Sequence, residues 1–238
     1  MPSLAAHADA VAELDDAVAR VEYAFYTMDT RSLKAAAGSI EQLVAPRELQ
    51  ALQAYYVAFA HWKLAQLYQE AGEAGARQSQ AAKAGGICVR YAETARKLDA
   101  RLAEAGALQA ICGTFEPGLT GARPTCGRSK LLRDARETEP TNPRIQLIEA
   151  LCVAEQERVS GAYLERLRGV VEAFEPVPSS AVRRPDWGLA EALVALAQCH
   201  LQRGDQVSAR DAVERALVIA PDYRQAQALL AKASARPR

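Results

Sequence analysis

The chain contains three histidines and five cysteines, residue types that often bind metal ions or act as nucleophiles. His7, His61 and His200 are spaced too widely for any two to share a helix face as metal ligands. The sequence has no His-Glu-x-x-His motif, no nucleophile elbow and no local Cys–His signature. We therefore predict a protein that is not an enzyme, with no catalytic residues, no metal site and no cofactor. We expect His200 to pack in a core and regard His61 as a candidate for contact with a partner.

The stretch GARPTCGRSK at residues 121–130 has some features of a phosphate-binding loop. However, five residues separate its two glycines where the motif has four, and Arg128 stands where the motif has lysine. We therefore expect a loop between two helices. The alternative is that Arg123 and Arg128 hold an anion, because guanidinium groups suit carboxylate and phosphate.

Composition favours an all-α protein. Half of the 238 residues are hydrophobic, only 6% are aromatic, and small alanine side chains suit closely packed helices. Basic and acidic residues balance at 29 each, so the chain has no long-range field that would gather phosphate backbones, and we predict no nucleic-acid partner. No apolar run reaches the roughly 20 residues that cross a bilayer, so we predict no direct membrane insertion. The first residues lack the basic and apolar regions of an intact signal peptide.

The stretch Trp187 to Ala231 reads as two helices joined by a tight turn at Gly204-Asp205. Its spacing resembles the tetratricopeptide repeat (TPR), a 34-residue helix-turn-helix with small residues at positions 8, 20 and 27 and proline at position 32. In this chain those positions are taken by Ala197, Ala209, Ala216 and Pro221. The resemblance implies a TPR-like superhelical array of antiparallel helix hairpins.

The same register extends along the chain and predicts a single TPR-like domain, residues 1–238, of about five helix pairs. Besides the hairpin above, we predict helices over residues 8–28, 31–45, 47–71, 87–99, 102–113, 128–139, 144–157, 160–174 and 222–234. Glycine-rich stretches predict inserted loops at 72–86 and 113–127, and prolines predict an extended connector at 175–186.

Three cysteines, Cys112, Cys152 and Cys199, fall at position 10 of their repeats. A small apolar side chain that packs against the neighbouring helix explains this placement. Equivalent positions in successive repeats lie roughly 10 Å apart, too far to share one zinc ion. For Cys112 a disulfide with Cys126 in an oxidising compartment stays open as an alternative.

The resemblance also implies a mode of action. In TPR arrays the first helices of the hairpins line a concave groove, and repeat positions 2, 5, 9, 12 and 13 face it. We therefore predict that the chain is a scaffold that binds a protein or peptide segment there. The residues predicted to contact the partner are Phe59, Trp62, Gln66, Glu104, Ile111, Arg144, Leu147, Leu151, Val194 and Gln198. Trp62 is either the anchor of this groove or a residue that packs against the first repeat.

A second hypothesis makes the array a structural, self-associating subunit of a bacterial envelope assembly. The blocks YAFYTMDTRSL, GRSKLLRDARETEPTNPRI and RPDWGLAEALVALAQCHL resemble a group of uncharacterised bacterial TPR proteins, many of which carry a signal peptide. This resemblance implies a periplasmic protein, with the cytoplasm as the alternative. We expect a monomer or a weak homo-oligomer.

Overall fold

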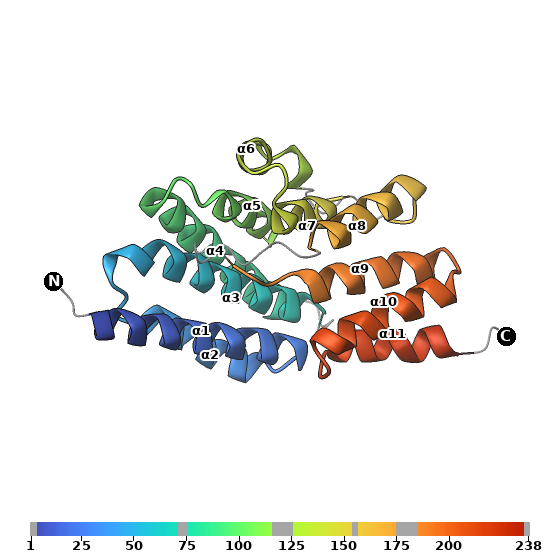
Figure 1. Cartoon of the computed structure of the whole chain (residues 1–238), viewed down its shortest axis with the longest axis horizontal. Helices are drawn as coiled ribbons and strands as arrows, with labels where there is room; N and C mark the ends of the chain where they lie inside the picture. Colours follow the sequence, from blue (N-terminus) through green and yellow to red (C-terminus); the bar gives the residue numbers. More distant parts are fainter. Residues whose placement is uncertain (1–3, 71–75, 116–125, 154–156, 175–184, 236–238) are drawn as a thin grey trace. The chain divides into compact units, whose positions relative to one another are not determined.

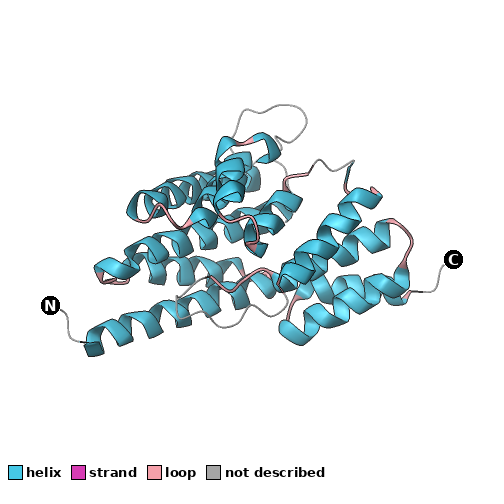
Figure 2. Cartoon of the chain, turned by 45° about the horizontal axis from the view of Figure 1, so that its top comes forward, coloured by secondary structure: helices cyan, strands magenta, loops and turns pink. Residues whose placement is uncertain are grey.

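The structure is a computed structural model that describes residues 4–70, 76–115, 126–153, 157–174 and 185–235. Within these ranges every regular element is a helix, and no strand occurs (Figure 2). Contacts divide the chain into two compact units, residues 1–138 and 139–238, which we describe one at a time.

The described residues of the first unit form three antiparallel helix hairpins, α1–α2, α3–α4 and α5–α6, of which the first is blue in Figure 1. Short 3-10 turns, labelled η, flank some of the helices. The elements are α1 (Leu4–Tyr26), α2 (Thr30–Gln42), η1 (Arg47–Leu49), α3 (Gln50–Glu70), α4 (Ala76–Leu98), α5 (Ala103–Cys112), η2 (Gly113–Phe115), η3 (Cys126–Arg128) and α6 (Lys130–Thr138).

Local chemistry sets both ends of α2. Met28 takes a left-handed backbone conformation with φ of 57°, which turns the chain between α1 and α2. Asp29 then caps α2, because its carboxylate accepts the backbone N–H groups of Arg31 and Ser32 at 3.0 Å each. At the other end the Gln53 amide donates to the carbonyl oxygens of Ile40 and Leu43, both at 2.8 Å.

Helix α3 is the centre of the first unit. Most of its residues are buried, and they lie on every side of the helix, as expected of a helix that is surrounded by others. It contacts α1, α2, α4 and α5, and every residue from Ala54 to Ala60 is buried. The surrounding helices therefore hold α3 and its side chains in place.

The predicted loop at 72–86 is wrong for residues 76–86, which form the first half of α4. Alanine, glutamine, lysine and arginine favour helix here, and they outweigh the two glycines on which the prediction depended. Gly85 is explained by packing, because a Cβ there would lie 2.5 Å from Phe115 Cβ. Residues 71–75 lie outside the described ranges.

The second unit contains the hairpins α7–α8 and α9–α10 and a final helix that packs on α10 and α9. Gly204, with φ of 79°, makes the predicted turn between α9 and α10, and the Asp205 carboxylate caps α10 through the Ser208 N–H at 3.0 Å. The helices are α7 (Pro143–Leu151), α8 (Gly161–Ala173), α9 (Leu189–Gln202), α10 (Gln206–Ile219) and α11 (Arg224–Ser234).

Helix α7 ends at Leu151, six residues before the predicted end at 157. No glycine or proline marks this end in the sequence. Instead, the Arg158 guanidinium donates to the carbonyl oxygens of Leu151 at 3.0 Å and Val153 at 3.3 Å. Arg203, the residue that follows α9, donates to the carbonyl oxygen of Val159 at 2.8 Å. The carbonyl groups at the end of the helix are therefore bound by Arg158, from the segment that directly follows α7.

The small residues at repeat positions 8, 20 and 27 are buried in both units. In the α9–α10 hairpin Ala197, Ala209 and Ala216 are fully covered, as are Ala65, Cys88 and Ala95 in the α3–α4 hairpin. Small side chains at these positions let paired helices approach closely. The predicted all-α, TPR-like array of helix hairpins is confirmed.

The prediction of a single domain stays a prediction. Of the predicted loop at 113–127, the two described edges form the single turns η2 and η3, and residues 116–125 lie outside the described ranges. The same holds for residues 175–184 of the predicted connector, of which the structure describes Pro185 onward as irregular backbone.

Candidate partner-binding faces

The ten residues predicted to contact a partner all lie on first helices of hairpins. In the first unit Phe59, Trp62 and Gln66 lie on α3, and Glu104 and Ile111 lie on α5. In the second unit Arg144, Leu147 and Leu151 lie on α7, and Val194 and Gln198 lie on α9. Their exposure divides them into a buried majority and three accessible residues.

Phe59 and Trp62 are core residues of the first unit, exposed by 0% and 1%. Their rings are 6.2 Å apart, centroid to centroid, and tilted by 61°. The Lys63 Nζ lies 4.3 Å from the ring centroids of both Trp62 and Phe25 of α1, and 5.1 Å from that of Phe59. Trp62 therefore packs beside the first hairpin. This is the alternative in which Trp62 packs against the first repeat, and not the one in which it anchors the groove.

Sequence reasoning missed Lys63, although one signal was present. It is a lysine within a predominantly apolar stretch of α3, and it is 1% exposed. A charged side chain at such a position must find partners inside the protein. Here three aromatic faces surround its ammonium group, which cation–π attraction favours.

Glu104 and Ile111 are also buried, at 2% and 7% exposure. The Tyr55 hydroxyl of α3 donates to Glu104 Oε2 at 3.1 Å, so this carboxylate links α3 to α5. Glu104 also stands in the first turn of α5, where the helix dipole favours a negative charge. These contacts give Glu104 a structural role in the free protein.

In the second unit Arg144, Leu147 and Val194 are buried as well. Asn142 positions the first turn of α7 by accepting the N–H groups of Arg144 and Ile145. Leu147 lies in a tightly packed corner, because a Cβ on Gly188 would lie 3.4 Å from Leu147 Cδ2 and 2.6 Å from Phe174 Cζ. The φ of 119° at Gly188 also requires glycine.

Gln66, Leu151 and Gln198 are the three predicted residues that are partly exposed. Gln66 has an unusual feature, because its Oε1 atom is buried and has no hydrogen-bond partner among the described residues. A buried acceptor without a donor costs about 1–3 kcal/mol. Partner contact by the ten residues stays a prediction, and these three are the ones that a partner reaches without displacing the core.

The structure contradicts the Cys112–Cys126 disulfide that the sequence left open as an alternative. Cys112 forms a disulfide with Cys88 of α4, not with Cys126, and the two Cα atoms are 6.0 Å apart. Both cysteines are fully buried between α4 and α5. The sequence alternative considered only the nearby loop, because spacing along the chain does not show that Cys88, in the predicted helix 87–99, lies next to Cys112 on the neighbouring helix.

The pair Cys199–His200 near the end of α9 is held inside the second unit. The Cys199 thiol lies 3.4 Å from the Arg158 carbonyl, and burial raises the pKa of this thiol. His200 is 4% exposed, which confirms the predicted core position, and its Nδ1 atom is 3.1 Å from Asp205 Oδ2. Neither side chain is presented to a substrate in this arrangement.

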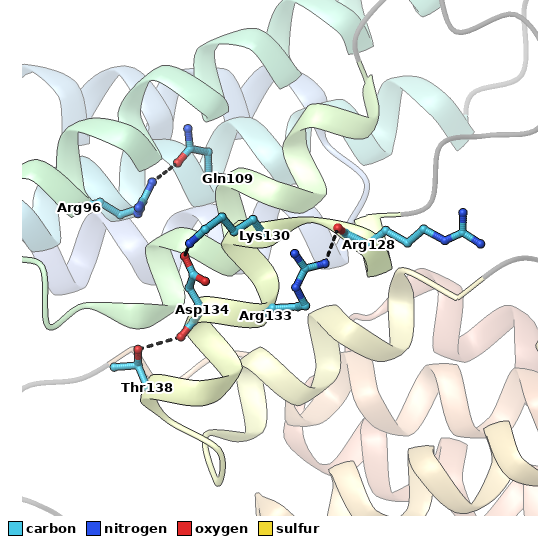
Figure 3. A network of polar contacts seen from close by, with 7 residues as sticks. All are labelled: Arg96, Gln109, Arg128, Lys130, Arg133, Asp134 and Thr138. Atoms are coloured by element: carbon cyan, nitrogen blue, oxygen red, sulfur yellow. Dashed lines mark hydrogen bonds and ion pairs between the residues drawn. The ribbon is translucent and has the colours of Figure 1, made fainter.

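Basic side chains around the start of α6 are engaged in local contacts (Figure 3). Lys130 pairs with Asp134 at 2.7 Å, Arg133 donates to the Arg128 carbonyl at 3.0 Å, and Arg96 donates to Gln109 at 2.8 Å. The Arg128 guanidinium extends away from this network. Arg123, the second arginine of the suggested anion site, lies outside the described ranges, so that suggestion stays a prediction.

The described residues contain no group of three or more histidine, cysteine or acidic side chains arranged to hold a metal ion. Among the described helices, none combines the length and the apolar character that a membrane span requires.

Comparison with known proteins finds likeness only among solved structures. No protein-family model matches the chain, and no curated protein matches it. Among solved structures the chain is similar to YrrB, a TPR protein with an unusual peptide-binding site. The two share 14% identity over 83% of each chain, with a TM-score of 0.38. The TPR-like fold described above rests on the helix hairpins and the buried small residues themselves.

Proposed function

We propose that the chain is a non-catalytic scaffold that binds a peptide or protein segment along the first helices of its hairpins. The observation that supports this most directly is Gln66 on α3, whose buried Oε1 lacks a donor while the residue itself is partly exposed. In the free protein this atom is covered, so the Gln66 amide would turn outward to accept one of the N–H donors that a peptide backbone carries at regular intervals.

Gln198 of α9 and Leu151 of α7 offer comparable accessible positions in the second unit. Amides pair with a peptide backbone and leucine supplies apolar contact, which suits recognition of an extended segment. The buried aromatic residues of α3 then support the binding face from behind, as a rigid core.

Selection from a phage-displayed library of random peptides tests this proposal. Peptides recovered on the full chain would be synthesised and measured by fluorescence anisotropy against Gln66→Ala and Gln198→Ala. Gln80→Ala is the matched control, because Gln80 is an exposed amide on the second helix α4. We expect Gln66→Ala to weaken binding about tenfold, the loss of one hydrogen bond that a buried acceptor makes.

The free protein supplies an internal check. Gln66→Ala removes an unpaired acceptor, so its urea midpoint should equal or exceed that of the wild type. Recovery of no peptide, or equal weakening by Gln66→Ala and Gln80→Ala, would contradict binding along the first helices. Light scattering of the same samples tests the self-association hypothesis. A monomer mass that does not change with protein concentration would contradict it.

We also propose that the protein works in an oxidising compartment such as the periplasm. The Cys88–Cys112 disulfide supports this, because structural disulfides persist in oxidising compartments and are rare in the cytosol. Both cysteines are buried, so reductants reach the bond only when the unit opens.

Mass spectrometry of the protein from its source cells, alkylated before lysis, tests the compartment. Digestion with trypsin and chymotrypsin separates Cys112 from Cys126, because Phe115 and Leu119 lie between them. We expect a linked Cys88–Cys112 peptide pair. Alkylated Cys88 and Cys112 in most of the molecules would contradict the proposal and favour the cytoplasm.

A further inference from the structure

Helix α5 of the first unit has the features of a helix that is weak by itself. It is 10 residues long, its N-cap residue Leu102 makes no side-chain capping hydrogen bond, and Gly106 stands in its interior. Isolated helices shorter than about 12–15 residues are marginal in water, and an interior glycine lowers helix propensity further. Helix α5 therefore depends on its neighbours for its stability.

The side chains that α5 buries are mostly small. Nine of its ten residues are buried, but five of the nine are alanine or glycine, and Leu108 and Ile111 are its two large apolar side chains. Because the free energy of burial grows with the apolar area removed from water, small side chains contribute little. By comparison, α3 buries two tyrosines, a phenylalanine and a tryptophan. Burial alone thus holds α5 less firmly than α3.

Two hydrogen bonds join α5 to the α3–α4 hairpin. The Tyr55 hydroxyl of α3 donates to Glu104 Oε2 at 3.1 Å. The Arg96 guanidinium of α4 donates to Gln109 Oε1 at 2.8 Å (Figure 3). When α5 moves away, water replaces each partner, so the net contribution of these bonds to docking is small.

The third attachment is covalent and lies at the last residue of α5. Cys112 is joined to Cys88 of α4, 24 positions earlier in the sequence. The two helices are close at this end, because a Cβ on Gly85 would lie 3.2 Å from the Cys112 carbonyl oxygen. A disulfide that closes a loop of this length favours the docked state by about a hundredfold, since it removes the freedom of the two cysteines to separate.

We propose that the Cys88–Cys112 bond is a redox-sensitive attachment of α5, and that reduction of this bond lets α5 open from α3 and α4. A dithiol reductant supplies two electrons and two protons, so the S–S bond breaks into two thiols while the reductant forms its own disulfide. The open state is then about a hundredfold more populated, and it uncovers Tyr55, which is 0% exposed in the closed state. This inference does not depend on peptide binding or on the compartment in which the protein works.

Hydrogen exchange of the full chain, followed by mass spectrometry, tests the proposal on the variant Cys88→Ala/Cys112→Ala. Substitution isolates this bond, because Cys126 is also disulfide-bonded and a reductant would break that bond as well. We expect amide exchange in α5 to become about a hundredfold faster than in the wild type, while exchange in α3 changes by less than about twofold. Helix α3 is the control, because its aromatic cluster with Phe25 of α1 does not involve the bond.

Reduction of the wild type supplies a second measurement. After incubation with dithiothreitol, alkylation and mass spectrometry give the fraction of Cys88 and Cys112 present as thiols. We expect α5 exchange in this fraction to reach the value of the variant, and α5 exchange in the variant itself to be unaffected by the reductant. An α5 that is as protected in the variant as in the wild type would overturn the proposal. Equal acceleration of α3 and α5, or an unfolded variant, would also overturn it, because the bond would then stabilise the whole unit rather than the docking of α5.

Discussion

The α3–α4 hairpin of the first unit and the α9–α10 hairpin of the second share one register but are stabilised differently. In both, small residues are buried where the helices meet. In the α9–α10 hairpin the turn depends on neighbours in sequence, namely a glycine and the Asp205 cap, and its long-range side-chain contacts are hydrogen bonds from Cys199 and Arg203 to backbone carbonyl groups. The α3–α4 hairpin depends on distant partners, namely the Cys88–Cys112 disulfide and the Tyr91–Glu41 and Tyr55–Glu104 hydrogen bonds. The same repeat can thus be maintained locally or by long-range contacts.

Removing the Cys88–Cys112 disulfide should change the stability of the protein more than any other substitution considered for the two hairpins. Cys88 and Cys112 close a loop of 24 residues, so Cys88→Ala/Cys112→Ala should lower the free energy of unfolding by about 3 kcal/mol. Cys199→Ala, at the equivalent register position but with a free thiol, should cost about 1 kcal/mol. Urea unfolding by circular dichroism measures both. Equal losses would mean that the two hairpins do not differ in the way described.

The buried lysine should give the second largest effect. Lys63→Ala removes a packed side chain and an ammonium group surrounded by Phe25, Phe59 and Trp62, and should cost about 2 kcal/mol. Lys97→Ala is the control, because Lys97 is exposed and paired only with Glu93, and should change stability by less than about 0.5 kcal/mol. In a Trp187→Phe background, fluorescence reports on Trp62 alone. A Lys63→Ala variant as stable as Lys97→Ala would show that the aromatic cluster does not need the cation.

Two adjacent glycines of α4 offer an internal test of long-range packing. Gly85→Ala should cost about 1.5 kcal/mol, because the new Cβ would lie 2.5 Å from Phe115 Cβ. Gly86→Ala meets nothing within 4 Å and should stabilise the helix by about 0.5 kcal/mol, since alanine has the higher helix propensity. Thermal unfolding of the two variants gives the signs. A change of the same sign in both would contradict the close approach of α4 to η2.

The difference between the hairpins also explains what the sequence could and could not predict. The turn at Gly204-Asp205, the buried alanines of α9–α10 and the core position of His200 follow from residues close in sequence, and all were predicted correctly. The partner of Cys112 and the surroundings of Lys63 depend on side chains from other helices, and the end of α7 at Leu151 involves Arg158 in the segment that follows. Periodicity reports which face of a helix is buried, but it does not report which distant residue covers it.

The predicted binding residues show the same division. Their placement on first helices followed from the register, because repeat positions fix which helix each residue occupies. Their exposure did not follow, because Phe59, Trp62 and Leu147 are covered by neighbours that the register does not specify. The partly exposed Gln66, Leu151 and Gln198 are therefore better targets for mutation than the large apolar residues.

The smallest effect on stability should come from Asp205, the residue that caps α10 in the second unit. Asp205→Ala removes the carboxylate that caps α10 and should cost about 1 kcal/mol near pH 7, while Asp205→Asn retains a capping oxygen and should cost less. The hydrogen bonds from the Ser208 side chain and backbone, helped by His200, lower the pKa of Asp205 from its ordinary 3.8. Its stabilisation is therefore present above pH 3.8 and is lost as the pH falls through the lower folded value. The difference in the free energy of unfolding between the wild type and Asp205→Ala should therefore become smaller at the acidic end of a series of urea titrations at different pH values. A gap that stays constant down to the acid transition would mean that the cap acts through shape rather than charge, because a protonated carboxyl group would then serve as well as a carboxylate.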